Sequence, residues 1–187
     1  MRKSLIFFAA FTALAFATSA DKSIDAAKST MTVHVYKSGA FSAFGHEHEV
    51  SAPIAEGSFN EETPAVTLRV ESAKMRVVDK EISDTDRTKV QETMLGPQVL
   101  DSSKFPQIVF KSSSADRLGD GKWLIHGDLM LHGQSHPVNV HVEGQSGHYQ
   151  GFAEIKQKDF GMTPVSAGGG SVKVKNELRI EFDIWGK

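Results

Sequence analysis

The segment from Val172 to Ile184 constrains the fold of this chain more than any other feature. Its apolar residues fall at positions 172, 174, 178, 180, 182 and 184, and charged or polar residues occupy most of the positions between them. A period of two places these two sets on opposite faces of an extended strand. Strands in globular proteins usually have about 3–10 residues. A strand of this length therefore favours a β-barrel over a compact β-sandwich.

The same alternation recurs along the chain, and turn residues such as Gly119–Gly121 and Gly133–Pro137 separate the runs. Short connections of this kind join antiparallel neighbours. One segment differs, because residues 85–94 are polar and tolerant of helix, with few β-branched side chains. The sequence therefore predicts an all-β antiparallel barrel of about eight strands, with a short helix near one end. The further predicted strands lie within 31–36, 66–71, 108–110, 122–131, 138–143 and 149–157.

The first twenty residues have the layout of a secretory signal peptide. Arg2 and Lys3 precede an uncharged apolar run, and small residues follow it up to Ala20. The run is shorter than the roughly 20 residues that span a bilayer, so no stable membrane insertion is expected after cleavage. We expect cleavage after Ala20, with Ala17 as the alternative. Residues 21–187 would then form a single domain in the periplasm.

Composition excludes several classes of function. The chain has no cysteine, so it can form neither disulfides nor thiolate metal sites, and it has no cysteine nucleophile. Removing Arg2 and Lys3 with the signal peptide leaves 19 basic against 23 acidic side chains. No basic stripe is available to displace counterions from phosphates. We therefore expect no nucleic-acid partner.

Three stretches in register resemble the YceI-like family of exported polyisoprenoid-binding proteins. They are residues 94–112 with Leu100-Asp101 and Lys104-Phe105-Pro106, residues 127–138 with Gly127-Asp128-Leu129 and His132-Gly133, and Asp159-Phe160-Gly161 followed by 172–177. The resemblance covers about residues 24–184. It implies a lipocalin-like barrel that holds the isoprenoid tail of a quinone or polyprenyl lipid in its apolar lumen.

Strand parity selects the residues that would face this lumen. Burial of a long hydrocarbon is not directional, so no polar motif is required for it. The alternative is that the same side chains fill a solid core. The candidates for contact with the lipid are Val33, Val35, Val66, Leu68, Phe110, Ile125, Leu129, Val140, Ile180 and Phe182.

Four of the eight histidines are candidates for contact with a polar headgroup. His46 and His48 lie two residues apart, so an extended backbone points both to one face. His132 and His136 flank a predicted turn. If the four converge at one barrel mouth, they could bind a quinone carbonyl or a phosphate, and His46 with His48 could ligate Zn²⁺ or Cu²⁺. The alternative is that they are solvated or purely structural histidines.

Three functions remain open at this point. The first is a non-catalytic periplasmic carrier of an isoprenoid lipid, with no cofactor required. The second is a metal- or quinone-associated redox accessory protein that uses His46 and His48. The third is a ligand-free interaction or stress-response module with a solid core. An enzyme is not expected, because no Gly-x-Ser-x-Gly elbow or other nucleophile–base arrangement stands out. A homodimer is possible.

Overall fold

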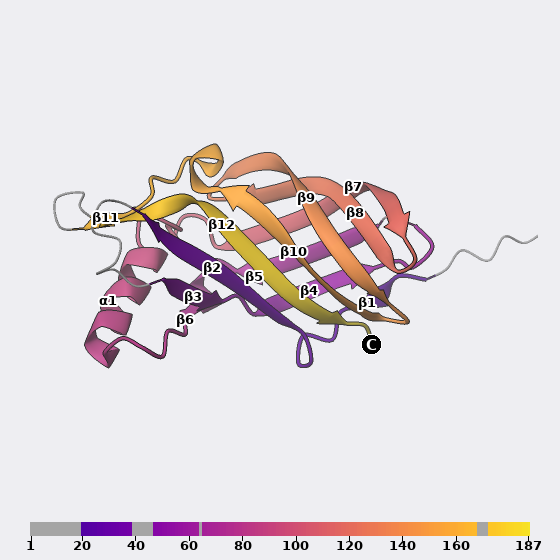
Figure 1. Ribbon diagram of the computed structural model, residues 1–187, viewed down its shortest axis with the longest axis horizontal. Coiled ribbons are helices and arrows are strands. Elements are labelled where there is room, and N and C mark those ends of the chain that lie inside the picture. Colours follow the sequence, from indigo (N-terminus) through magenta and orange to yellow (C-terminus); the bar gives the residue numbers. More distant parts are fainter. Residues whose placement is uncertain (1–19, 39–46, 64, 168–171) are drawn as a thin grey trace, which may run out of the picture.

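A computed structural model describes residues 20–38, 47–63, 65–167 and 172–187 of the chain (Figure 1). The predicted signal peptide falls almost entirely on residues 1–19, which lie outside the described residues. Within the described ranges, no helix is both long enough and apolar enough to cross a membrane.

One curled antiparallel sheet makes up most of this structure, as predicted (Figure 1). Its strand order is β1-β4-β5-β7-β8-β9-β10-β12-β2-β3-β6, and β11 pairs with β12. The described residues thus form twelve strands rather than about eight, and three of these have only two residues. The strands are β1 (Lys22–Ser23), β2 (Thr30–Ser38), β3 (His48–Ser51), β4 (Ile54–Phe59), β5 (Val66–Glu71), β6 (Arg76–Val77), β7 (Gln107–Gly119), β8 (Lys122–Leu131), β9 (Gln134–Gln145), β10 (His148–Lys156), β11 (Ser166–Ala167) and β12 (Val172–Trp185).

Two connections give the sheet its barrel-like shape. At one end, β3 pairs with β2 and continues through Ala52 into β4, which pairs instead with β5. At the other end, β1 pairs with β4, and the next residue, Ile24, forms a bridge with Gly186 just after β12. The backbone N–H of Asp25 also donates to the carbonyl of Trp185 at 2.7 Å. The chain thus links β3, near one end of the strand order, to β4, near the other end, and the segment after β1 contacts the segment after β12. These links reduce the exposed edge of the sheet.

The helix α1 (Asp84–Leu95) lies at one end of the sheet, which confirms the predicted helix (Figure 1). Ser83 caps its N-terminus, because the side-chain oxygen accepts a hydrogen bond from the N–H of Asp86. None of its residues is fully buried, but Val90, Met94 and Leu95 pack against the apolar core. The helix thus contacts the apolar core through these three side chains, and it has no fully buried residue.

Two sequence motifs form tight local structures. His132 and Gly133 both have positive φ angles, 51° and 74°, as the two-residue turn between β8 and β9 requires. Asp159-Phe160-Gly161 ends the 3₁₀ helix η3 (Gln157–Phe160), and Gly161 adopts φ 72° as its cap. The side chain of Phe160 is only 1% exposed. The resulting turn folds η3 back onto the sheet.

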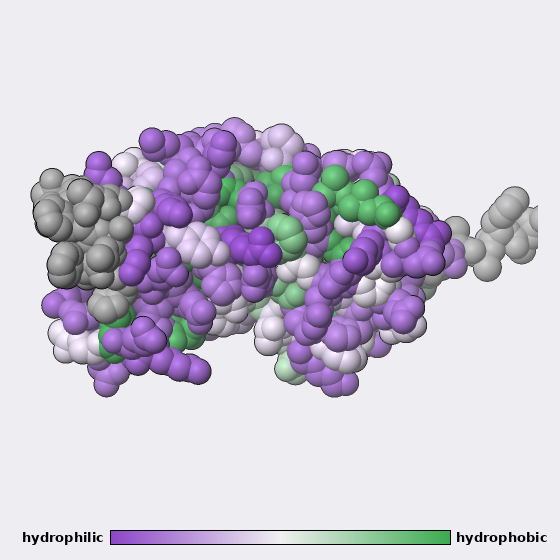
Figure 2. All heavy atoms as spheres, in the orientation of Figure 1, coloured by the Kyte–Doolittle hydropathy of each residue, from purple (hydrophilic) through white to green (hydrophobic). Residues whose placement is uncertain are grey.

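The outer surface of the sheet is largely hydrophilic in the view of Figure 2, with hydrophobic residues in separate patches. This follows from the alternation in the sequence, since every second side chain of a strand points outward. The apolar set points inward, and the site is found there.

Candidate functional site

A cavity of about 580 Å³ lies inside the curled sheet. Side chains from β2, β3, β4, β5, β7, β8, β9, β10 and β12 line it, and α1 contributes at one end. Small-molecule sites in proteins typically measure about 300–1,000 Å³. The inward set of side chains therefore lines a space large enough for a ligand, rather than filling a solid core.

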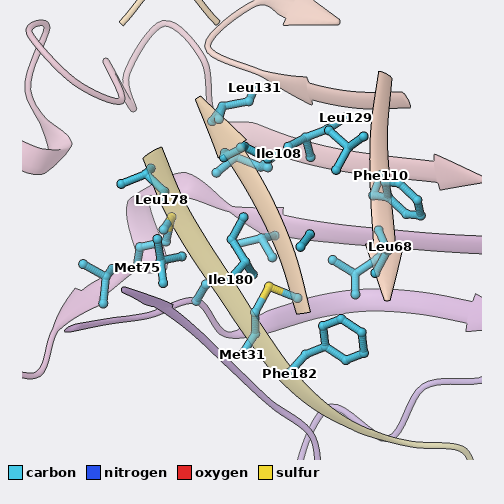
Figure 3. A pocket seen from close by; sticks show the side chains of 18 of the residues that line it. Met31, Leu68, Met75, Ile108, Phe110, Leu129, Leu131, Leu178, Ile180 and Phe182 are labelled. Carbon is cyan, nitrogen blue, oxygen red and sulfur yellow. The ribbon is translucent and has the colours of Figure 1, made fainter. Parts of the chain in front are cut away.

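All ten residues that strand parity placed in the lumen lie on the wall of this cavity. Figure 3 shows how side chains from β2, β5, β7, β8 and β12 point into one common space, with Met31, Leu68 and Phe110 among them. That these residues contact a lipid stays a prediction. The ten are Val33, Val35, Val66, Leu68, Phe110, Ile125, Leu129, Val140, Ile180 and Phe182.

Glycines at inward positions let aromatic rings lie flat against the wall. A Cβ atom on Gly127 of β8 would come within 2.6 Å of the Phe110 ring, and one on Gly151 of β10 within 2.7 Å of the Phe182 ring. Such contacts are far shorter than van der Waals distance, so only glycine permits these ring positions. Each ring therefore lies over a glycine of the neighbouring strand and forms part of the cavity wall.

Sequence reasoning missed the residues that line the cavity from outside the long strands. Met75 follows the 3₁₀ helix η2 (Ser72–Lys74), Leu100 follows α1, and Met162 follows η3. All three are buried, with exposures of 2–7%. Irregular segments carry no periodicity, so only their apolar character signalled a role in the core. Methionine is flexible and polarizable, and it fits walls of irregular shape.

A hydrogen-bonded pair, His48 and Asp79, lies at the α1 end of the cavity. His48 belongs to the cavity lining, and its Nδ1 lies 2.5 Å from Oδ2 of Asp79. The other carboxylate oxygen of Asp79 accepts the backbone N–H of Glu49 at 2.6 Å. Asp79 itself is only 8% exposed. A buried carboxylate that accepts from Nδ1 fixes the orientation of the imidazole ring.

Three lysines also line the cavity, and all three belong to its α1 end. Lys37 and Lys173 lie where β2 pairs with β12, since Lys37 is in register with Val174. Lys89 is on α1 and lies 3.4 Å from the carboxylate of Asp86. Lysine often covers apolar surface with its methylene stem while its ammonium group reaches water. At this end of the cavity, the described lining residues are mostly apolar and include these three lysines.

The opposite end of the cavity has a different polar group. The hydroxyl of Tyr149 donates to Glu61 at 3.0 Å, and Lys22 forms an ion pair with the same carboxylate. The rings of Phe59 and Trp123 contact Tyr149 edge to face, with centroids 5.2 and 5.9 Å away. Burial, and after it the hydrogen bond to the Glu61 carboxylate, raises the pKa of Tyr149 to about 12. The phenol therefore stays neutral and keeps its donor role at ordinary pH.

The predicted histidines do not share one location. His132 and His136 are absent from the cavity lining and pack around Phe160 instead. Nδ1 of His132 donates to the carbonyl of Phe160 at 3.1 Å, and the ring of His136 lies 5.2 Å from the Phe160 ring. His46 lies outside the described residues. Among those described, no group of three or more His, Cys, Asp or Glu side chains is placed to hold a metal. Metal binding by His46 with His48 stays a prediction.

Comparisons with known proteins agree with this architecture. A structure of BcnA from Burkholderia cenocepacia superposes with a TM-score of 0.66 at 20% identity, over 86% of this chain and 98% of that one. The YCEI protein of Campylobacter jejuni gives a TM-score of 0.52 at 13% identity, over 100% and 99% of the two chains. At these identities the likeness shows the fold alone.

Sequence relatives point the same way. A UPF0312 protein of Vibrio cholerae is 29% identical over 114 residues, 56% of this chain and 59% of that protein. A UPF0312 protein of Shewanella denitrificans is 31% identical over 124 residues, 60% and 64% of the two chains. The matches thus span less than two thirds of the length of these curated relatives. The sequence model of the YceI-like domain matches residues 23–185, nearly the whole of the described fold. The chain therefore belongs to the YceI-like family.

Proposed function

We propose that this protein is a periplasmic carrier that binds a polyisoprenoid lipid, of the quinone or polyprenyl type, in the cavity of its barrel. The observation that carries the proposal is the cavity of about 580 Å³ with an almost entirely apolar wall. The YceI-like family is known as a polyisoprenoid-binding fold, and its members are in general non-enzymatic binding proteins. A binding role without catalysis agrees with the family and with the apolar lining of the cavity.

The apolar wall suits a hydrocarbon tail because burial is favourable wherever the tail lies along it. Burying one methylene contributes about 0.8 kcal/mol, so a five-carbon isoprene unit contributes up to about 4 kcal/mol before ordering costs. Affinity should therefore rise by at least about tenfold with each isoprene unit until the cavity is filled. A longer tail that protrudes into water would add nothing.

The first test is native mass spectrometry of the protein purified without detergent, followed by organic extraction. We expect an additional mass that extraction identifies as a prenyl compound, or uptake of geraniol, farnesol and geranylgeraniol with affinity rising in that order. A correctly folded protein that stays at its bare mass after incubation with long prenols and quinones would overturn the proposal. A mass increase equal to one metal ion would instead favour the accessory redox role of His46 and His48.

A substitution that fills the cavity tests the location of the ligand. Ala153 of β10 lines the cavity and is 7% exposed, so a phenylalanine there would occupy ligand space. Ala55 of β4 is exposed and does not line the cavity, so Ala55→Phe makes the same change on the outer surface. We expect Ala153→Phe to lower prenol affinity at least about tenfold and Ala55→Phe to leave it unchanged. Thermal unfolding of both variants checks that the fold is kept. Equal prenol affinities of the two variants would place the ligand outside the cavity.

A further inference from the structure

We propose that α1 is a hinged lid over the cavity, and that the side-chain amide of Gln91 is the clasp that holds this lid shut. The ligand enters and leaves when the helix swings away, while the long strands keep their pairing. Such a lid rests on the proposed carrier function, because a bound lipid needs a route into the cavity. It adds the part of the protein that moves.

One face of α1 forms part of the cavity wall at the end of the sheet (Figure 1). The helix contributes Lys89, Val90, Thr93 and Met94 to the lining. They form two pairs spaced by four residues, which places them on one face of the helix. Lys89 and Thr93 are nevertheless exposed to solvent. The helix therefore lies between the cavity and water, as a lid does.

Few apolar contacts hold this helix in place. Three of its twelve residues are apolar, namely Val90, Met94 and Leu95, and none of the twelve is fully buried. The strands, by contrast, contribute fully buried side chains such as Val50 and Leu131. Segments with little buried apolar surface open at a lower free energy than the core does. Displacing α1 therefore costs less than opening the sheet.

The amide of Gln91 takes the place of a further strand beside β6. This strand is the last in the order of the sheet. Oε1 of Gln91 accepts the backbone N–H of Val77 at 2.8 Å, and Nε2 donates to the carbonyl of Met75 at 2.9 Å. A neighbouring strand would offer the same acceptor and donor. Nε of Arg87 adds a hydrogen bond to the carbonyl of Asp79 at 2.9 Å. The moving helix must break the two contacts of Gln91.

The segments on either side of α1 contain fixed points and exposed links. Before the helix, Asp79 is fixed to β3, because its carboxylate is bonded to His48 and to the N–H of Glu49. After the helix, Leu100 is buried in the core. Loop residues between a fixed point and a lid absorb the changes in φ and ψ when the lid moves. Exposed residues of these links are at positions 80, 81, 83, 97 and 98.

The opposite end of the cavity is held in a different way. There Ile24 forms a bridge with Gly186, and the carboxylate of Glu61 binds both Lys22 and Tyr149. These contacts join segments that are far apart in the sequence, so opening this end would separate several strands at once. Gln91 and Arg87, in contrast, bind the segment that directly precedes their own helix. We therefore assign the movement to α1.

Hydrogen exchange tests the lid without any ligand. Amides of α1 should exchange at least about tenfold faster than those of β8 and β12. Gln91→Ala should speed exchange in α1 at least about fivefold, because two hydrogen bonds are lost, and should leave the strands unchanged. Glu92→Ala is the matched control, since Glu92 is the next residue of the helix, is exposed and does not line the cavity. Equal exchange in the two variants would overturn the clasp, and exchange of α1 at the rate of the strands would overturn the lid.

Stopped-flow fluorescence tests whether the lid controls entry. Trp123 lines the cavity, so its emission in a Trp185→Phe background reports the binding of farnesol. Gln91→Ala should raise the association and dissociation rates at least about fivefold each. The affinity should stay within about twofold, because easier opening speeds both directions while the closed state still predominates. Glu92→Ala should change neither rate. Unchanged rates in Gln91→Ala would refute the clasp.

A reversible cross-link provides the converse test. Gln91 contacts the residues on either side of Arg76, and the chain has no cysteine of its own. The variant Arg76→Cys/Gln91→Cys is therefore joined by oxidation or by a short reagent that alkylates both thiols, and mass spectrometry confirms the link. The cross-link should slow both farnesol rates at least about tenfold, and reduction of the disulfide should restore them to the rates of Gln91→Ala. Unchanged rates in the cross-linked protein would show that the ligand uses another route.

The outcomes separate the lid from the carrier function. Wild type that binds farnesol, with equal rates in the cross-linked and free proteins, would overturn the lid and leave the carrier intact. Wild type that takes up no farnesol, by fluorescence or by native mass spectrometry, would overturn the carrier. Hydrogen exchange would then still decide whether α1 opens independently of the sheet.

Discussion

Replacing Phe160 with alanine should destabilise the folded chain by about 3–5 kcal/mol. Phe160 is 1% exposed, and its side chain belongs to the main apolar cluster, against which residues of β2, β5, β8 and α1 also pack. The ring also contacts the imidazole of His136 at 5.2 Å. Gly161 and the η3 turn fix the backbone at this point, so the surroundings have little freedom to collapse into the space that the ring leaves. We therefore expect a cost toward the upper end of the range.

Urea unfolding followed by circular dichroism measures this cost. With a slope of about 2 kcal/mol per molar urea, the midpoint should fall by about 1.5–2.5 M. Phe152→Ala is the control, because that ring lies on the outer face of β10, stacked on His141 and covered by the Arg179 guanidinium at 3.7 Å. It should cost only about 1 kcal/mol. Equal shifts for the two variants would show that burial of Phe160 is not the source of its contribution.

Three further predictions concern the polar groups. Hydrogen bonds to Asp116 and Asn139 raise the pKa of His126 above 6.5, so its contribution to stability is fully present below pH 6.5 and is lost as the pH rises through the raised pKa. NMR titration should show this raised pKa in wild type and a lower one in Asp116→Asn; no difference would contradict the assignment. Tyr149 should ionise at about pH 12 in an ultraviolet titration, and Glu61→Gln should lower this pKa. An unchanged pKa in Glu61→Gln would show that burial alone raises it. Ser83→Ala should cost about 1 kcal/mol in thermal unfolding by removing the cap of α1, and an unchanged melting temperature would contradict that role.

The alternation of apolar and polar residues predicted most of the sheet, but not every strand boundary. The predicted run at 108–110 is the start of β7, which continues to Gly119. A bulge between Ser112 and Ser114 shifts the register, and polar residues then occupy both faces, so the period of two is lost. β3 and β4 were missed because the chain bends at Ala52-Pro53 and changes its pairing partner there. Pairing across the sheet, rather than local pattern, determines these segments.

The cavity wall was predictable wherever a strand is regular. Parity identified residues such as Val140 and Ile180, because successive side chains of a strand alternate between its faces. It could not show that the enclosed space is hollow, since that depends on the curvature of the whole sheet. Nor could it place Lys37 or Lys173 on the wall, because charged residues near strand ends are usually solvated. Only the folded structure shows that these two lysines line the cavity.

The junction of Ile24 with Gly186 has a practical consequence for handling the protein. It places residues 20–25 and 184–187 together, at the end of the molecule away from α1 (Figure 1). A tether fused at Lys187, whose backbone N–H donates to Ser23 at 2.9 Å, would leave the helix-bearing rim facing free solution. A sensor chip or bead coupled there would present that rim to dissolved lipids in one uniform orientation, with no attached group in their path.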